Sequence, residues 1–195
     1  MTALLMLLLM GIYGNWDSPR VWIYFAVHGS YGLLWVLKSY IFPDSQWEKP
    51  VPLWYGLVSF FGLALYWIAP WLLVSGRTSA PPTWLLGAAV FVYAIGVFFH
   101  FASDMQKHVS LSLRPGVLLT TGLWARLRNP NYFGELLIYA SFGLIAYHYV
   151  TFVILGVFVA AVWIPNMIKK ERSLSRYPEF AEWKARSYLM LPGVW

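Results

Sequence analysis

Long apolar stretches separated by short polar loops dominate the pattern of this sequence. Apolar runs cover residues 20–42, 51–74 and 83–102, and each is long enough to cross the ~30 Å hydrocarbon core of a bilayer as one helix. A shorter run covers residues 2–13, and the run 136–165 is too long for a single untilted helix. The pattern predicts an all-α, polytopic helical membrane bundle.

The long run 136–165 is expected to divide at residues 147–151, Tyr-His-Tyr-Val-Thr, where a tight hairpin would join two helices. This division gives about six transmembrane helices, or five if the short first run does not cross. A length of 195 residues favours a single domain. Within it, residues 1–102 supply the N-terminal spans. Residues 103–195 supply a stretch, 103–130, that should lie at the membrane interface or re-enter, then the helical hairpin and a basic tail.

The distribution of basic residues predicts how the chain is oriented. Residues 103–130 carry four Lys/Arg and the tail from residue 166 carries six, whereas the turn 147–151 carries none. By the positive-inside rule both basic stretches lie in the cytoplasm, and working backwards along the spans puts both termini there as well. The net charge of +6 is therefore interpreted as membrane orientation, and membrane lipids are expected partners. It does not point to nucleic acid, because no soluble basic domain is present to bind it.

The residues that are missing also restrict the chemistry. The chain has no cysteine, which excludes disulfides, thiolate catalysis and cysteine-ligated zinc or iron–sulfur centres. It contains no HExxH, P-loop, GxSxG or GxGxxG motif. We therefore expect no metal site, and any nucleotide would be held in a manner different from that of a Rossmann fold.

A polar cluster, residues 122–135, stands directly before the apolar run 136–165 and reads Gly-Leu-Trp-Ala-Arg-Leu-Arg-Asn-Pro-Asn-Tyr-Phe-Gly-Glu. Pro130 suits a first helical turn, so a new helix is expected near Asn131, with Asn131 and Glu135 on one face. The free N–H groups of that turn favour a phosphate or carboxylate. A capped helix behind a positive-inside loop would explain the arginines, but not Glu135 inside an apolar segment.

Further candidates flank this cluster. His100 and Asp104 are four residues apart and can share a helix face, where they would hold hydroxyl or amide groups of a cofactor; Asp104 can equally well simply end a helix. Arg114, Arg126 and Arg128 stand in the same stretch. Guanidinium groups suit phosphates, and lipid headgroups would attract them equally well.

One face of the second apolar run carries His28 and Tyr31, followed by Trp35. Histidine and tyrosine can act as general acids, so this face is a candidate proton donor in a lipid-substrate cavity. A packed aromatic stripe is the alternative interpretation.

The motif Arg-Asn-Pro-Asn-Tyr-Phe-Gly-Glu at 128–135, with Gly-Leu-Trp before it and Ser-Asp-Met-Gln-Lys at 103–107, resembles the C-terminal domain of the steroid 5α-reductase family. It is most similar to small bacterial members of unknown function. Related families are the sterol reductases, with Arg-His-Pro-Asn-Tyr, and the isoprenylcysteine and phospholipid methyltransferases, with Arg-His-Pro-x-Tyr and an acidic pair near the tail. In this chain Asn129 replaces that histidine.

The reductase resemblance implies that Asp104, Asn131 and Glu135 hold a nicotinamide cofactor and that Arg114 contacts its phosphate. The wider set of expected cofactor-binding residues comprises His100, Asp104, Arg114, Arg126, Arg128, Asn131, Tyr132, Glu135 and Glu171. The alternative, a methyltransferase, is favoured by Glu171, although Lys170 replaces the other member of the acidic pair.

The resemblance thus predicts a membrane-embedded, NADPH-dependent reductase of a sterol-like or isoprenoid enone in a bacterial inner membrane. Its cofactor site would face the cytoplasm, and its lipophilic small-molecule substrate would enter from the bilayer. The first alternative is an S-adenosylmethionine-dependent methyltransferase of a lipid or prenylated carboxylate. The second is a non-catalytic, lipid-binding membrane factor whose basic tail docks on headgroups.

Overall fold

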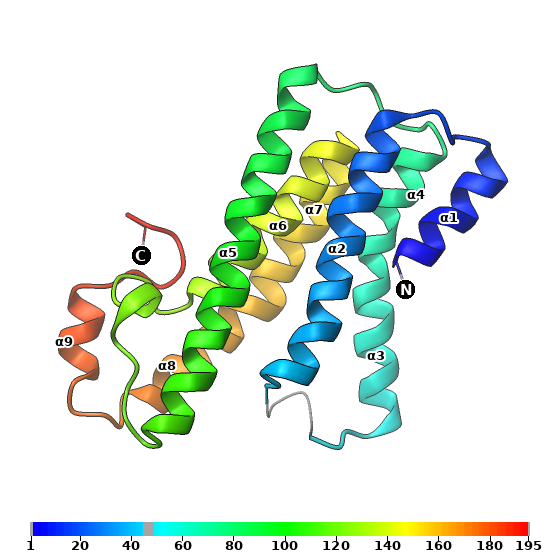
Figure 1. Cartoon of the computed structure of the whole chain (residues 1–195). Coiled ribbons are helices and arrows are strands. Elements are labelled where there is room, and N and C mark those ends of the chain that lie inside the picture. The colour runs from blue at the N-terminus through cyan, green and yellow to red at the C-terminus, as the bar shows by residue number, and fades with distance from the viewer. Residues whose placement is uncertain (1, 45–48, 195) are drawn as a thin grey trace. The chain divides into compact units, whose positions relative to one another are not determined.

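The computed structural model describes residues 2–44 and 49–194, and these residues are 74% helical and contain no strand. In chain order the α-helices are α1 (Thr2–Tyr13), α2 (Pro19–Ile41), α3 (Leu53–Ala64), α4 (Ile68–Val74), α5 (Thr83–Leu113), α6 (Pro130–Ala146), α7 (Tyr149–Phe158), α8 (Ile164–Leu174) and α9 (Phe180–Ala185) (Figure 1). A 3-10 turn, η1 (Leu65–Trp67), joins α3 to α4, and a π-helical segment, η3 (Val159–Trp163), joins α7 to α8. A second 3-10 turn, η2 (Gly122–Trp124), precedes α6.

Within the described residues, three helical runs are long and apolar enough to cross a membrane: Leu53–Val74, Thr83–Leu113 and Tyr149–Leu174. They indicate a membrane-embedded protein. The helix α2 has 23 residues but is less apolar, and α1 has only 12. The six spans and the cytoplasmic termini remain predictions.

Several expected elements are confirmed. The first helix covers residues 2–13, α6 begins at Pro130, and a turn separates α6 from α7 at Tyr147, whose φ is 52°. In the tail, Pro178 lies in the break between α8 and α9, where its missing N–H group costs no helical hydrogen bond. The centre of the polar loop 43–50 lies outside the described residues.

The stretch 103–130, expected to lie at the membrane interface or to re-enter the bilayer, is helical in its first part. Its first part continues α5 through Leu113, and the chain leaves the helix only at the Pro115–Gly116 pair. The residues between Ser103 and Leu113 include no proline or glycine, so nothing in the local sequence ends the helix earlier. Their polarity argues against a transmembrane position but not against a helix.

The chain divides into two compact units. Unit 1 comprises Met1–Tyr93 and Tyr139–Leu155, and unit 2 comprises Ala94–Ile138 and Gly156–Trp195. In unit 1, α1 packs against both α2 and α4 (Figure 1). The aromatic core of unit 1 is built around Phe142, on which the ring of His28 is stacked with the centroids 4.2 Å apart.

Unit 2 contains the close crossing of α5 and α6. A Cβ atom added to Gly96 would lie 2.8 Å from the carbonyl oxygen of Gly134. A Cβ atom added to Gly134 would lie 2.6 Å from the carbonyl oxygen of Gly96 and would collide with the backbone of His100. Two glycines therefore allow the backbones of these helices to touch, as small residues do in membrane helix pairs.

Candidate functional site

The α5–α6 crossing brings His100 to the start of α6. His100 is 2% exposed, and its Nδ1 atom lies 3.2 Å from the backbone oxygen of Asn131. Because a carbonyl oxygen only accepts, Nδ1 carries the proton of this hydrogen bond. The glycine of the Asn-Tyr-Phe-Gly-Glu motif, Gly134, thus has a packing role that places the motif against α5.

The side chain of Asn131 has a polar atom that its surroundings do not satisfy. Its Oδ1 atom is buried and has no hydrogen-bond partner among the described residues. Buried polar atoms in native proteins are nearly always paired, so an orphaned acceptor indicates a missing partner such as a ligand or water. Asn131 also lies in the first turn of α6, where N–H groups are free.

Two carboxylates lie one helical turn away from these residues. Asp104 follows His100 by four positions on α5 and is 6% exposed, and Glu135 follows Asn131 by four positions on α6 and is half-buried. Residues four apart on a helix are neighbours on its surface. The structure therefore places all four of these predicted residues in unit 2, on two helices that touch at the glycine pair.

The loop before the motif is fixed by Gln106, a residue that the sequence did not single out. Its Nε2 donates to the carbonyl oxygen of Thr121 at 2.9 Å, and its Oε1 accepts from the backbone N–H of Leu123 at 3.1 Å. Gly122 adopts a φ of 60°, and a Cβ atom there would collide with the Gln106 amide. A left-handed, crowded position of this kind explains the glycine of the Gly-Leu-Trp motif.

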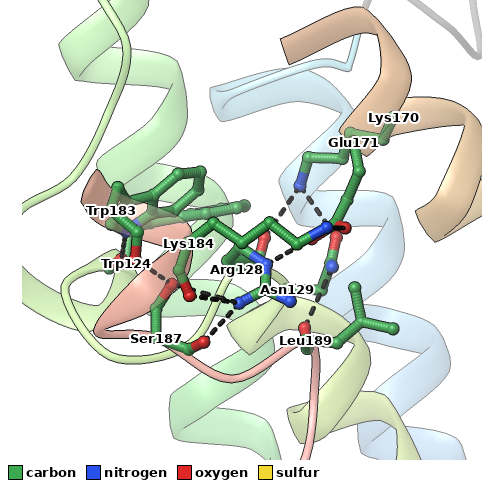
Figure 2. A network of polar contacts seen from close by, with 9 residues as sticks. All are labelled: Trp124, Arg128, Asn129, Lys170, Glu171, Trp183, Lys184, Ser187 and Leu189. Carbon is green, nitrogen blue, oxygen red and sulfur yellow. Dashed lines mark hydrogen bonds and ion pairs between the residues drawn. The ribbon is translucent and has the colours of Figure 1, made fainter. Parts of the chain in front are cut away.

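Arg128 makes its hydrogen bonds and its ion pair to groups within the protein. It is 4% exposed, its Nε is paired with the carboxylate of Glu171, and its Nη1 donates to the backbone and side-chain oxygens of Ser187. Figure 2 shows this guanidinium enclosed by groups of α8 and of the C-terminal segment. A second cation, Lys184, lies 3.0 Å from the other Glu171 oxygen. Arg128 and Glu171, both expected to bind cofactor, are therefore partners of each other.

Asn129 is held in the same network. It is 1% exposed; its Nδ2 donates to the carbonyl oxygen of Leu189 at 3.0 Å, and its Oδ1 accepts from the Lys170 ammonium at 2.9 Å (Figure 2). Lys170 also donates to the Arg128 carbonyl at 3.2 Å and lies 4.4 Å from the centre of the Trp124 ring. The residue that replaces the histidine of related families thus bridges two segments of unit 2.

The C-terminal segment 187–189 runs beside residues 126–129. The N–H of Tyr188 donates to the Arg126 carbonyl at 2.9 Å, and the N–H of Arg128 donates to the Tyr188 carbonyl at 2.8 Å. The indole N–H of Trp183 donates to the Trp124 carbonyl at 2.8 Å. Backbone pairing and side-chain contacts together fix both sides of the turn that leads into α6.

The other predicted cofactor residues lie around this region. Arg114 and Arg126 are exposed, and Nη1 of Arg126 lies 3.3 Å from the carbonyl oxygen of Arg186. Tyr132 packs against Trp163 with ring centroids 5.4 Å apart. These two arginines keep faces accessible to an anion, which Arg128 does not. Among residues 2–44 and 49–194, no three His, Cys, Asp or Glu side chains gather to hold a metal ion.

The two candidate catalytic residues belong to unit 1. His28 is 7% exposed, and its Nδ1 atom lies 3.1 Å from the hydroxyl of Tyr24. Tyr31 is buried and meets the ring of Tyr139 edge-on at 5.9 Å. Both side chains therefore contribute to the aromatic core of unit 1, whatever further role they have.

A protein family whose description reads "Protein of unknown function (DUF1295)" matches residues 45–186. The chain belongs to this family. The family is related to steroid 5α-reductase-like proteins. No curated protein and no solved structure matches the chain significantly.

Proposed function

We propose that this protein is a membrane-embedded, NADPH-dependent reductase of a sterol-like or isoprenoid enone. The observation that carries the proposal is the buried, unpartnered Oδ1 atom of Asn131 at the start of α6. The relation of the family to steroid 5α-reductase-like proteins supports it. Within that relation we place the chain beside the small bacterial members, in the inner membrane, with its cofactor site facing the cytoplasm.

The residues present fit a nicotinamide cofactor in four respects. An acceptor such as Asn131 Oδ1 matches the N–H donors of a carboxamide, and a carboxylate such as Asp104 suits ribose hydroxyls. Glu135 supplies a second acceptor on the face of Asn131. For the phosphates, the exposed Arg114 and Arg126 are suitable, whereas the internally paired Arg128 is not.

The protein's own contribution would be orientation. Bound NADPH would supply a hydride, and the fixed polar groups of α5 and α6 would set the position of its ring. His100 holds the backbone of Asn131, and the glycine pair holds the two helices together. Preorganised groups of this kind lose little free energy to reorganisation when the reaction takes place.

A second candidate function is an S-adenosylmethionine-dependent methyltransferase of a lipid or prenylated carboxylate. It is favoured by the pairing of Arg128 with Glu171, which removes one cation from those available to bind the phosphates of NADPH. A sulfonium cofactor carries less negative charge and needs fewer cations. The same Asn131 and Asp104 side chains would then hold an amino-acid or ribose group.

The activity itself separates these candidates. The full chain in detergent is incubated with NADPH deuterated at the transferring carbon and an isoprenoid enone, and separately with methyl-labelled S-adenosylmethionine and a prenylated acid. Deuterium at the β-carbon of the saturated product supports the reductase. Methyl transfer without deuterium transfer would contradict the reductase and support the methyltransferase. Neither reaction with any lipid class would favour a non-catalytic lipid-binding factor.

A further inference from the structure

Residues 128 and 129, directly before Pro130 and Asn131, are held more tightly than a helix start requires. The carbonyl oxygen of Asn129 accepts from the N–H of Phe133 at 3.1 Å, which begins the hydrogen-bond ladder of α6. Its side chain meanwhile uses both of its polar atoms on other segments, Leu189 in the C-terminal segment and Lys170 on α8. One buried amide thus connects the start of α6 with two separate parts of unit 2.

Arg128 adds a second connection to the same two segments. Its backbone N–H pairs with Tyr188, and its guanidinium joins Glu171 of α8 to Ser187 of the C-terminal segment (Figure 2). Buried, fully hydrogen-bonded polar networks rigidify the parts that they join. The turn into α6 is therefore immobilised from two directions.

The contrast between Asn131 and its two bonded neighbours indicates what this network does. Two residues separate Arg128 from Asn131, yet Nε and Nη1 of Arg128 and both side-chain polar atoms of Asn129 are bonded internally, while Oδ1 of Asn131 is not. A binding group works best when its neighbours are locked and its own acceptor is left open for the ligand. A network serving stability alone would not need to end beside an open acceptor.

We propose that Asn129 is a positioning residue, through which the C-terminal segment 187–189 and Lys170 fix Asn131 for ligand binding. The role needs one donor and one acceptor in a buried side chain. Histidine also has one of each in its neutral form, whereas aspartate keeps only the acceptor and leucine has neither. The proposal rests on the proposed function for the identity of the ligand, but the positioning itself is measurable without one.

The test compares the full-length chain with Asn129→His, Asn129→Asp and Asn129→Leu, and with Asn166→Leu, which changes an exposed asparagine of α8. Hydrogen exchange followed by mass spectrometry reads the backbone amides of residues 133–135, the first hydrogen-bonded amides of α6, in detergent. We expect exchange to accelerate at least about tenfold in Asn129→Leu, less in Asn129→Asp, and little in Asn129→His and Asn166→Leu, in proportion to the buried hydrogen bonds lost. Faster exchange confined to residues 187–189, or no recovery in Asn129→His, would overturn the proposal.

NADPH affinity is measured on the same proteins as a second readout. We expect the dissociation constant to rise at least about tenfold in Asn129→Leu and to return towards wild type in Asn129→His, because only the latter restores the donor and the acceptor. If wild type binds neither NADPH nor S-adenosylmethionine, the proposed function fails. The ranking of the variants by hydrogen-exchange rate then decides the positioning role by itself. Should Asn129→Leu not fold, Asn129→Asp and Asn129→His give the same comparison with isosteric or polar side chains.

Discussion

The two units solve the burial of polar side chains in different ways. In unit 1, the ring of His28 is stacked on Phe142 and its Nδ1 atom is bonded to the Tyr24 hydroxyl, within an aromatic core. In unit 2, charge-assisted hydrogen bonds join Arg128 to Glu171 and Asn129 to Lys170, which both lie on α8. Unit 2 also contains Asn131, whose acceptor its own surroundings leave open. The comparison locates the candidate chemistry in unit 2, although the apolar helices alone do not distinguish the units.

The largest effect is expected from breaking the ionic network on one side only. Arg128→Met leaves the Glu171 carboxylate and the Ser187 carbonyl without their buried partner, so we expect a loss of about 3 kcal/mol in the free energy of unfolding. Lys184 stays close to Glu171 and keeps the loss at the lower end of the usual range. Denaturant titration of the detergent-solubilised protein measures it.

The control for this prediction is the double variant Arg128→Met with Glu171→Met, which removes both charges at similar volume. It should be more stable than Arg128→Met alone, because no buried charge is left uncompensated; Lys184 also loses its partner, but its side chain is 52% exposed. Equal instability of the single and double variants would show that the ionic pair does not organise unit 2.

The next effect concerns the α5–α6 crossing. Gly134→Ala should destabilise the protein by about 2 kcal/mol, because the added methyl group meets the backbone of α5 and overpacks the crossing. Gly87→Ala, in the helix α5 against which Gly134 packs, is the control, since nothing lies within 4 Å of a Cβ atom there. Similar midpoints for the two variants in thermal unfolding would contradict the close crossing.

A smaller effect is expected in unit 1. His28→Phe keeps a planar ring against Phe142 and loses only the hydrogen bond to Tyr24, so the free energy of unfolding should fall by about 1 kcal/mol. NADPH binding should not change. A folded His28→Phe protein without turnover would instead assign His28 a chemical role and would weaken the contrast between the units.

The smallest effect is expected at the surface of unit 2. Glu182 and Arg186 form an ion pair of 3.3 Å, but their side chains are 76% and 52% exposed. Solvent screens such pairs, so Glu182→Ala should change the free energy of unfolding by less than about 0.5 kcal/mol. A loss as large as that of Arg128→Met would mean that burial does not distinguish the two ion pairs.

The sequence could predict what local chemistry decides. Pro130 marks the start of α6, and the spacing of Asn131 and Glu135 follows from it. It could not predict the partner of Gly134, because a close helix crossing depends on residues distant in sequence. The role of Arg128 was equally hidden: its partners include backbone oxygens of the C-terminal segment, which have no side-chain signature. An arginine beside a cofactor motif resembles a phosphate ligand until its surroundings are known.

The most direct test of the account is thermal unfolding of the purified full-length chain with and without NADPH. The wild type is compared with Asn131→Ala and with Asn166→Ala, which alters an exposed asparagine. At about 100 times its dissociation constant, a ligand stabilises the native state by roughly 2.7 kcal/mol. We predict a raised midpoint for wild type and Asn166→Ala and no shift for Asn131→Ala. An equal shift in all three proteins, or none in a folded wild type, would contradict the assignment of Asn131 to an NADPH site.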